Sequence, residues 1–265
     1  MSAGPSLLFP AGRPPFRLTA SAASAGLAVL VLAPHPDDFD EVGVTLRRLR
    51  GAGGKIRLSV LSSSANGVED AFLDRPTDEA KAAVREEEQR RSLLFFGLGE
   101  ERLSFERLPT GAGGFLRDAS EGLDAVRRIL AEEPFDIVIL PHGHDTNPDH
   151  VLVSEWLRRA VPPGSIAPSA WLFRDPKTVA MRLDLVVPFD DEEASWKAEL
   201  LRCHASQQAR NLRQRGYGLD ERILRINRET ARAAGLAEPY AEGFEIVGTA
   251  AEPISEGGAS PARRA

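Results

Sequence analysis

The stretch LAVLVLAPHPDD, residues 27–38, is an apolar run that stops at a proline and then presents one histidine and two adjacent carboxylates. Such a run is typical of a buried strand whose carboxyl end opens into a charged loop, a common place for the active site of an α/β protein. A second apolar run, residues 135–140, also ends at a proline and leads into PHGHDTNPDH, residues 141–150. Because four of the five histidines lie in these two loops, we expect the loops to form one site.

The composition is that of a soluble globular protein, since 42% of the 265 residues are hydrophobic and 27% are charged. A net charge of -6 and a pI near 5.5 argue against a nucleic-acid partner. No apolar run approaches the ~20 residues of a membrane span, so no integral membrane association is expected. The single cysteine, Cys203, excludes an intramolecular disulfide and a cysteine-rich zinc site, and it fits a cytoplasmic location. Any metal must therefore be held by histidine and carboxylate side chains.

Strand and helix patterns alternate over the first part of the chain, with strands at residues 56–60, 103–108 and 135–140 and helices at residues 42–50, 78–97 and 123–130. This order predicts a mostly parallel sheet with right-handed crossovers and helices on both faces, a Rossmann-like three-layer α/β fold. In the strand order 3-2-1-4-5 the first and fourth strands are neighbours, and ligands bind in the crevice outside their carboxyl ends. The two charged loops would then face each other across that crevice.

The second half is less regular, with strand or helix patterns at residues 170–173, 183–187, 192–208 and 220–235. It contains no linker, and we predict a single domain over residues 26–250. Residues 1–25 lack the basic start and apolar core of a signal peptide and are predicted to be a loose extension, and residues 251–265 a disordered tail. The pocket is expected to be built by the irregular loops at residues 64–77, 109–118 and 174–182.

Three residues of the two charged loops have the chemistry of a catalytic zinc site, namely His35, Asp38 and His150. Two imidazoles and one carboxylate can hold zinc and leave a position open for water. Asp37, adjacent to Asp38 but free of the metal, is placed to act as general base on that water. Zinc would also polarise a carbonyl oxygen, so hydrolysis of an amide is the natural reaction.

Local structure offers a plainer interpretation of both loops. Residues 36–38 could form a turn that caps a helix. Asn147 is a good helix N-cap, Pro148 suits the first helical position, and Asp149 complements the positive end of the helix dipole. This interpretation does not explain why a histidine stands at position 150. A cation is disfavoured at a helix N-terminus, whereas a neutral metal-bound imidazole is not.

The motifs His35-Pro36-Asp37-Asp38 and Asn147-Pro148-Asp149-His150 resemble the signature motifs of the LmbE-like, or PIG-L-like, zinc-dependent N-deacetylases. Further landmarks of that family follow in the same order along the chain, namely Gly43 with Thr45, Arg85 with Glu88, HASQ at residues 204–207 and YAEGF at residues 240–244. The resemblance implies a zinc-dependent hydrolase that removes an N-acyl group, most simply acetyl, by attack of metal-bound water. The implied partner is a small-molecule N-acylated amino sugar or glycoconjugate, and assembly as a homo-oligomer stays open.

Position by position, the resemblance implies that Zn²⁺ binds His35, Asp38 and His150, that Asp37 is the general base, and that Arg85 and Glu88 shape the substrate pocket. The plainer alternative for the last two is an i,i+3 ion pair on a solvated helix face. His204 is expected to be a structural histidine or a pocket wall rather than a ligand, and Cys203 a small core residue.

Two positions depart from the family pattern. Phe39 stands where the family has a glutamate, whose role Asp40 or Glu41 could take. Asn147 stands where the family often has a histidine that stabilises the oxyanion and protonates the leaving amine. Asparagine can donate a hydrogen bond but cannot deliver a proton, and Asp149, the usual partner of that histidine, loses its role.

The candidate catalytic residues are therefore Asp37, Asn147, Asp149 and His144, and three outcomes stay open. Asp37 could act first as base and then as acid, with Asn147 at the oxyanion. His142 or His144 could occupy the vacant histidine position. The chain could instead be a catalytically weak or inactive family member that acts as a carbohydrate-binding protein. A nucleotide enzyme is disfavoured, because the loop after the first strand has carboxylates where a pyrophosphate needs backbone amides.

Overall fold

One eight-stranded sheet runs through the computed structural model, which describes residues 15–18, 26–161 and 168–248. The strands are β1 (Phe16–Arg17), β2 (Ala28–Ala33), β3 (Lys55–Val60), β4 (Leu103–Phe105), β5 (Ile137–Pro141), β6 (Ser169–Phe173), β7 (Leu185–Phe189) and β8 (Tyr240–Gly248). The α-helices are α1 (Gly43–Gly51), α2 (Asp78–Phe96), α3 (Ser120–Glu132), α4 (Pro148–Ala160), α5 (Asp191–Arg202), α6 (Ala205–Arg215) and α7 (Leu219–Ala233). Short 3-10 turns are η2 (Asp40–Val42), η3 (Ala65–Gly67), η4 (Asp70–Phe72), η5 (Glu100–Arg102) and η6 (Ala112–Gly114).

The strand order along the sheet is β1-β7-β8-β6-β5-β2-β3-β4. The strands β4, β3, β2, β5 and β6 are parallel neighbours in that sequence, which is the predicted order 3-2-1-4-5. Among the described strands only β8 runs antiparallel to its neighbours, β6 and β7. The predicted Rossmann-like fold with a mostly parallel sheet is therefore confirmed.

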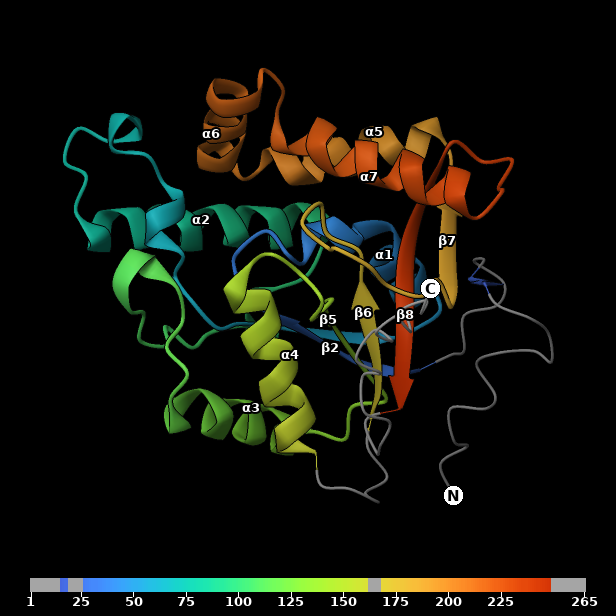
Figure 1. Ribbon diagram of the computed structural model, residues 1–265, viewed down its shortest axis with the longest axis horizontal. Coiled ribbons are helices and arrows are strands. Elements are labelled where there is room, and N and C mark those ends of the chain that lie inside the picture. The colour runs from blue at the N-terminus through green and yellow to red at the C-terminus, as the bar shows by residue number, and fades with distance from the viewer. Residues whose placement is uncertain (1–14, 19–25, 162–167, 249–265) are drawn as a thin grey trace, which may run out of the picture.

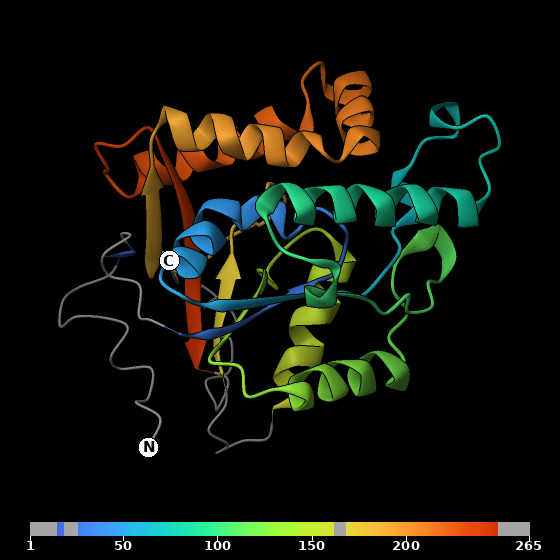
Figure 2. The same cartoon turned by 180° about the vertical axis from the view of Figure 1, so that it is seen from behind.

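Successive side chains of β2 enter two separate cores, because a strand alternates its side chains between the faces of a sheet. Val29 and Val31 belong to the core under α1, α2 and α5, whereas Leu30 and Leu32 belong to the core under α3 and α4. Helices α1, α2, α5, α6 and α7 lie on one side of the sheet and α3 and α4 on the other (Figure 1). The view from behind shows the same three layers (Figure 2).

Helix α2 begins and ends where its sequence predicts, and α4 begins where its sequence predicts. The side chain of Thr77 accepts a hydrogen bond from the Ala80 amide at the start of α2, and Gly97 ends that helix with a φ of 91°. Asn147 caps α4, its side chain accepting from the Asp149 amide, and Pro148 is the first helical residue. The helix-start interpretation of residues 147–149 is therefore correct, and His150 lies in the first turn of α4.

Three features differ from the sequence expectations. The predicted helix 192–208 is two helices, α5 and α6, because His204 leaves the helical conformation where its ring contacts the buried Asp40 carboxylate at 2.6 Å. Strand β8 was not predicted, since its pairing with β6 and β7 is a long-range property. Strand β1, inside the N-terminal segment, pairs in parallel with β7 and therefore lies against the sheet.

The remaining expectations for the chain ends, a loose extension over most of residues 1–25 and a disordered tail at residues 251–265, lie outside the described residues. Within the described part of the chain, no helix combines the length and the apolar character that crossing a membrane requires.

Candidate active site

The two charged loops meet because β2 and β5 are paired neighbours that end at the same edge of the sheet. His35 and Asp38 follow β2, whereas Asn147, Asp149 and His150 follow β5 in the first turn of α4. A cavity of about 340 Å³ opens above this edge. The three loops predicted to build it all contribute, through Ser64, Asn66 and Gly67, through Phe115, and through Asp175 and Lys177.

His35, Asp38 and His150 lie close enough to hold one metal ion, as their potential ligand atoms are all within 4.8 Å of one another. His35 Nδ1 is 3.5 Å from Asp38 Oδ2, and His150 Nε2 is 3.7 Å from Asp38 Oδ1. Ligands bonded at 2.0–2.1 Å in a tetrahedral zinc site lie about 3.3 Å apart. The spacing of these three side chains therefore fits a small divalent ion with little adjustment.

A second carboxylate stands behind each imidazole. His35 Nε2 is 2.9 Å from Asp149 Oδ2, and His150 Nδ1 is 3.4 Å from Asp145 Oδ2. Each ring thus has one nitrogen near Asp38 and the other near a carboxylate outside the triad. This is the carboxylate–histidine arrangement that fixes the tautomer of metal-binding histidines and raises their basicity.

The protonation of these groups follows from the contacts. Burial opposes a charge on His35, but hydrogen bonds to Asp149 and Asp38 outweigh it and raise the pKa of His35 to about 9. Burial likewise opposes the charge of Asp38, yet contact with His35 and the field of His150 lower its pKa. The pKa of Asp145 is lowered because its contact with His150 outweighs burial. Without a metal, the His35 ring is therefore a cation held between the carboxylates of Asp149 and Asp38.

Asp37 is held in an unusual backbone conformation, with a φ of 107° in the region that favours glycine. Its amide donates to Gln89 Oε1 at 3.1 Å, and its carboxylate accepts from Arg85 Nη2 at 3.0 Å. The same guanidinium nitrogen donates to the Pro36 carbonyl. Strain of this kind persists only where surrounding contacts fix it, and here both contacts come from α2.

Asn147 lines the cavity with its side-chain oxygen engaged in capping α4. The nitrogen of its side-chain amide is therefore the group left to donate a hydrogen bond into the cavity. Asp149 has a different partner from the expected one, because its Oδ2 meets His35 while its Oδ1 accepts from the Leu116 amide at 2.8 Å. Asp149 therefore has defined partners, His35 and the Leu116 amide, although position 147 is not a histidine.

Neither His142 nor His144 occupies the vacant histidine position, as neither lines the cavity among the described residues. His142 Nε2 faces Glu245 at 3.3 Å, and its Nδ1 accepts from the His144 amide at 3.0 Å. The side chain of His144 is exposed. The described contacts therefore do not support the expectation that one of them replaces the family histidine, since His142 contacts Glu245 and His144 is exposed.

Arg85 and Glu88 are both buried and do not form the solvated ion pair of the plainer alternative. Arg85 lines the cavity beside Asp37. Glu88 is not part of the described cavity lining and accepts from the amide and hydroxyl of Ser206, at 2.6 and 2.7 Å. It fixes the first turn of α6, which does line the cavity.

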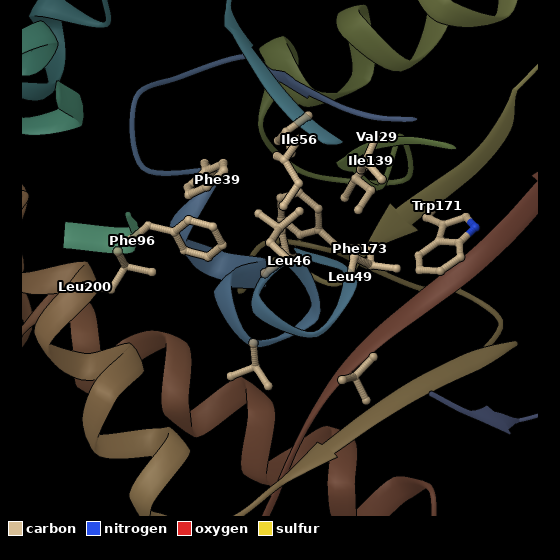
Figure 3. Packing of buried hydrophobic residues seen from close by; sticks show 14 of the residues in the cluster. Val29, Phe39, Leu46, Leu49, Ile56, Phe96, Ile139, Trp171, Phe173 and Leu200 are labelled. Atoms are coloured by element: carbon tan, nitrogen blue, oxygen red, sulfur yellow. The ribbon is translucent and has the colours of Figure 1, made fainter. Parts of the chain in front are cut away.

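The other family landmarks also meet in space. Glu242 accepts from the amides of Val44 and Thr45 at 3.0 and 2.8 Å, and from the buried ammonium of Lys197 at 2.6 Å. His204 contacts Asp40, and both side chains are fully buried, so His204 is structural as expected. Phe39 is fully buried and packs edge-on against Phe96, with ring centroids 5.1 Å apart (Figure 3).

Sequence reasoning missed several residues that line the cavity or contact the side chains of the site. Asp145 stands in the histidine-rich loop but was given no role, although a carboxylate near a ligand histidine is a recurrent signal. Asp175 lies with Asp145 and His150 in a second group that could hold a metal. Gln89 lies one residue after the family's Arg-x-x-Glu, and Arg210, Arg215 and Arg222 come from distant helices. Only the tertiary structure brings these residues to the site.

Comparison with known proteins agrees with the motifs. Residues 30–161 match the family described as PIG-L: GlcNAc-PI de-N-acetylase. The chain belongs to this family. A comparison with curated protein sequences gave no significant match.

Solved structures with a similar fold include two deacetylases and a hydratase. N,N'-diacetylchitobiose deacetylase from Pyrococcus horikoshii is 18% identical with a TM-score of 0.68, and the match covers 84% of each chain. Teicoplanin deacetylase Orf2 is 17% identical with a TM-score of 0.65, over 83% of this chain and 98% of that one. GalB, the 4-carboxy-2-hydroxymuconate hydratase from Pseudomonas putida KT2440, is 19% identical with a TM-score of 0.62, over 88% of this chain and 100% of that one. At these identities the likeness is one of fold, so the reaction of this PIG-L family member must be argued from its own site.

Proposed function

We propose that this PIG-L family member is a zinc-dependent N-deacetylase that removes an acetyl group from the nitrogen of an amino sugar or sugar conjugate. The observation that carries this proposal is the convergence of His35, Asp38 and His150 beside Asp37 at one end of the cavity. A potential metal triad with a separate carboxylate next to it is the equipment for hydrolysing an unactivated amide. The family match and the two deacetylase structures support the same reaction.

His35, Asp38 and His150 would hold the ion, with Asp149 and Asp145 orienting the two imidazoles. When bound, zinc supplies a Lewis acid for the amide carbonyl and lowers the pKa of water. Two histidines and one carboxylate can also hold Fe²⁺. Anomalous scattering at the zinc edge distinguishes the metals and the positions, since we expect the peak between the three ligands rather than in the group of Asp145, His150 and Asp175.

Asp37 takes the proton of the attacking water. Its carboxylate is fixed by Arg85 and its backbone by Gln89, so the base is held without being a metal ligand itself. As the new carbon–oxygen bond forms, negative charge develops on the former carbonyl oxygen. Asn147, whose amide nitrogen is free to donate, lies in the same cavity wall and would stabilise that oxygen.

The leaving amine needs a proton when the carbon–nitrogen bond breaks. Asparagine cannot provide it, and the two loop histidines lie outside the cavity lining. Asp37, protonated in the first step, is the group that returns its proton to the amine nitrogen. The products are acetate and a free amino sugar, and the carboxylate of Asp37 is regenerated.

A panel of N-acetylated sugars tests this proposal through the appearance of primary amine, with wild type compared with Asp37→Asn at equal zinc content. We expect wild type to release amine and the variant to lose about 10²- to 10⁴-fold in kcat, the usual contribution of a general base. Full activity in the variant would remove Asp37 from this role. A carbohydrate-binding protein, the alternative, would bind members of the panel and release no amine from any of them.

A further inference from the structure

Helices α6 and α7, which come late in the sequence, form one wall of the cavity, and this wall is basic. Arg210 and Arg215 of α6 and Arg222 of α7 line the cavity. The nearest hydrogen-bond partners of the first two are neutral, as Arg210 Nη1 donates to the Gly67 carbonyl at 3.4 Å and Arg215 Nη1 to Gln214 Oε1 at 3.1 Å. Within the described residues, none of the three guanidinium groups has a carboxylate at ion-pair distance, and Arg222 acts on the buried Glu41 only at longer range.

Other arginines of the same two helices show that acids are available on this surface. Arg213 pairs with Glu69, and Arg225 and Arg228 both pair with Glu221, at 3.0 and 3.1 Å. Among the described residues of these two helices, Arg210, Arg215 and Arg222 lack such a partner and line the cavity, whereas the exposed Arg232 at the end of α7 lacks one and lies outside the cavity lining. In a chain with more acidic than basic residues, such a group of unpaired cations is not explained by overall charge.

A further cationic group of the cavity has unsatisfied donors. Arg85 is almost completely buried, and its Nε and Nη1 have no hydrogen-bond partner. Burial lowers the pKa of Arg210 and the field of Glu69 opposes that shift, while the nearby Arg85 and Arg215 lower the pKa further because like charges repel. An anion in the cavity would relieve this repulsion and would satisfy guanidinium donors, whose planar geometry matches phosphate and carboxylate oxygens.

We infer that Arg210, Arg215 and Arg222 bind an anionic substituent, a phosphate or carboxylate, on the substrate whose N-acetyl group lies at the metal end. This inference rests on the proposed function for the position of the acetyl group. A cavity of about 340 Å³ accommodates one charged amino sugar. The cations determine which amino sugars bind, and they take no part in the bond-breaking step.

Steady-state amine release from matched substrates tests the inference. The neutral substrate is N-acetylglucosamine, and the anionic substrates are its 1-phosphate, its 6-phosphate and N-acetylmuramic acid, which distinguish phosphate from carboxylate and one position from another. The variants are Arg210→Gln and Arg222→Gln, and the matched control is Arg225→Gln, one turn further along α7 and paired with Glu221. Equal melting temperatures establish that all variants are folded.

We expect at least one anionic substrate to have a lower KM than the neutral sugar. Loss of one charge-assisted contact should raise that KM by about tenfold or more in each cavity variant, with kcat and the neutral-sugar KM changed by less than about twofold. The control should behave as wild type, and added salt should weaken only the anionic substrates. Equal KM values for neutral and anionic sugars, or equal effects of the variants on both, would overturn the inference.

Calorimetric titration of glucosamine 6-phosphate, glucosamine 1-phosphate and glucosamine separates this inference from the proposed function. Arginine-dependent binding of a phosphorylated amine without any amide cleavage would refute the deacetylase proposal and support the anion site. Efficient cleavage of the neutral sugar without anion preference would support the deacetylase proposal and refute the anion site.

Discussion

The contact between Asp149 and His35 predicts how zinc affinity depends on pH. Zinc must displace the proton that Asp149 and Asp38 stabilise on His35, and the pKa of that ring is about 9 in the metal-free protein. At pH 7 the neutral ring is then present at about 1 part in 100, so wild-type zinc affinity should rise about tenfold per pH unit between about 7 and 9 and then level off.

The substitution Asp149→Asn keeps an acceptor for the Leu116 amide and removes the charge beside His35. The pKa of His35 should fall, which flattens the pH dependence above neutrality. Above pH 9, where proton competition has vanished in both proteins, the variant should bind zinc about 10- to 100-fold more weakly, the usual effect of losing a carboxylate behind a ligand histidine. Wild type and variant should therefore differ more at high pH than at pH 7.

Competition with a chromophoric chelator at pH values from 6 to 10 measures this dependence. Asp124→Asn, an exposed carboxylate of α3, is the matched control and should follow wild type. The reasoning is refuted if wild-type affinity is independent of pH between 7 and 9, or if the Asp149→Asn curve runs parallel to it.

Five further substitutions have defined outcomes. Arg85→Lys keeps the positive charge but loses the guanidinium that contacts both the Asp37 carboxylate and the Pro36 carbonyl. We therefore expect kcat to fall about 10- to 100-fold with little change in KM. An unchanged kcat would contradict this expectation. Asn147→Ala should lower kcat about 10²- to 10³-fold in the amine-release assay. His142→Ala and His144→Ala should have little effect on kcat. The reverse pattern would place a loop histidine at the oxyanion. His204→Ala leaves a buried carboxylate unpaired and should lower the free energy of unfolding in urea by about 3–5 kcal/mol. Burial opposes charge on His204 but its carboxylate partner raises the pKa, so this stabilisation is full below about pH 6.5 and is lost as the pH rises through the raised value; a pH-independent difference would contradict it.

Periodicity and motif spacing predicted the part of the fold that positions the site. The uninterrupted apolar runs of β2 and β5, each ending at a proline, indicated two neighbouring strands, and the sheet order follows from chirality rules for parallel strands. The edge formed by β7 and β8 could not be predicted in the same way, because antiparallel pairing between distant segments leaves no local signal. The break between α5 and α6 depends on the contact of His204 with Asp40, which is 164 residues away in the chain.

The candidate site was predictable where the chemistry is local. His35 and Asp38 are three residues apart in one loop. His150 follows Asn147, Pro148 and Asp149, which the start of a helix explains, and the histidine itself needed another explanation. The partners of these residues could not be read from the sequence, since Asp149 meets His35 and Gln89 meets Asp37 only after the sheet and α2 are in place. The same holds for Glu88, whose motif suggested the pocket but whose contacts fix α6.

Acetate and amine release by the metal-stripped protein, before and after zinc is restored, tests the central claim most directly. With N-acetylglucosamine and its charged derivatives as substrates, we predict no release from the stripped protein and equal amounts of acetate and amine after one equivalent of zinc. Undiminished release without metal would contradict the claim, as would the failure of the zinc-loaded protein to cleave any member of the panel.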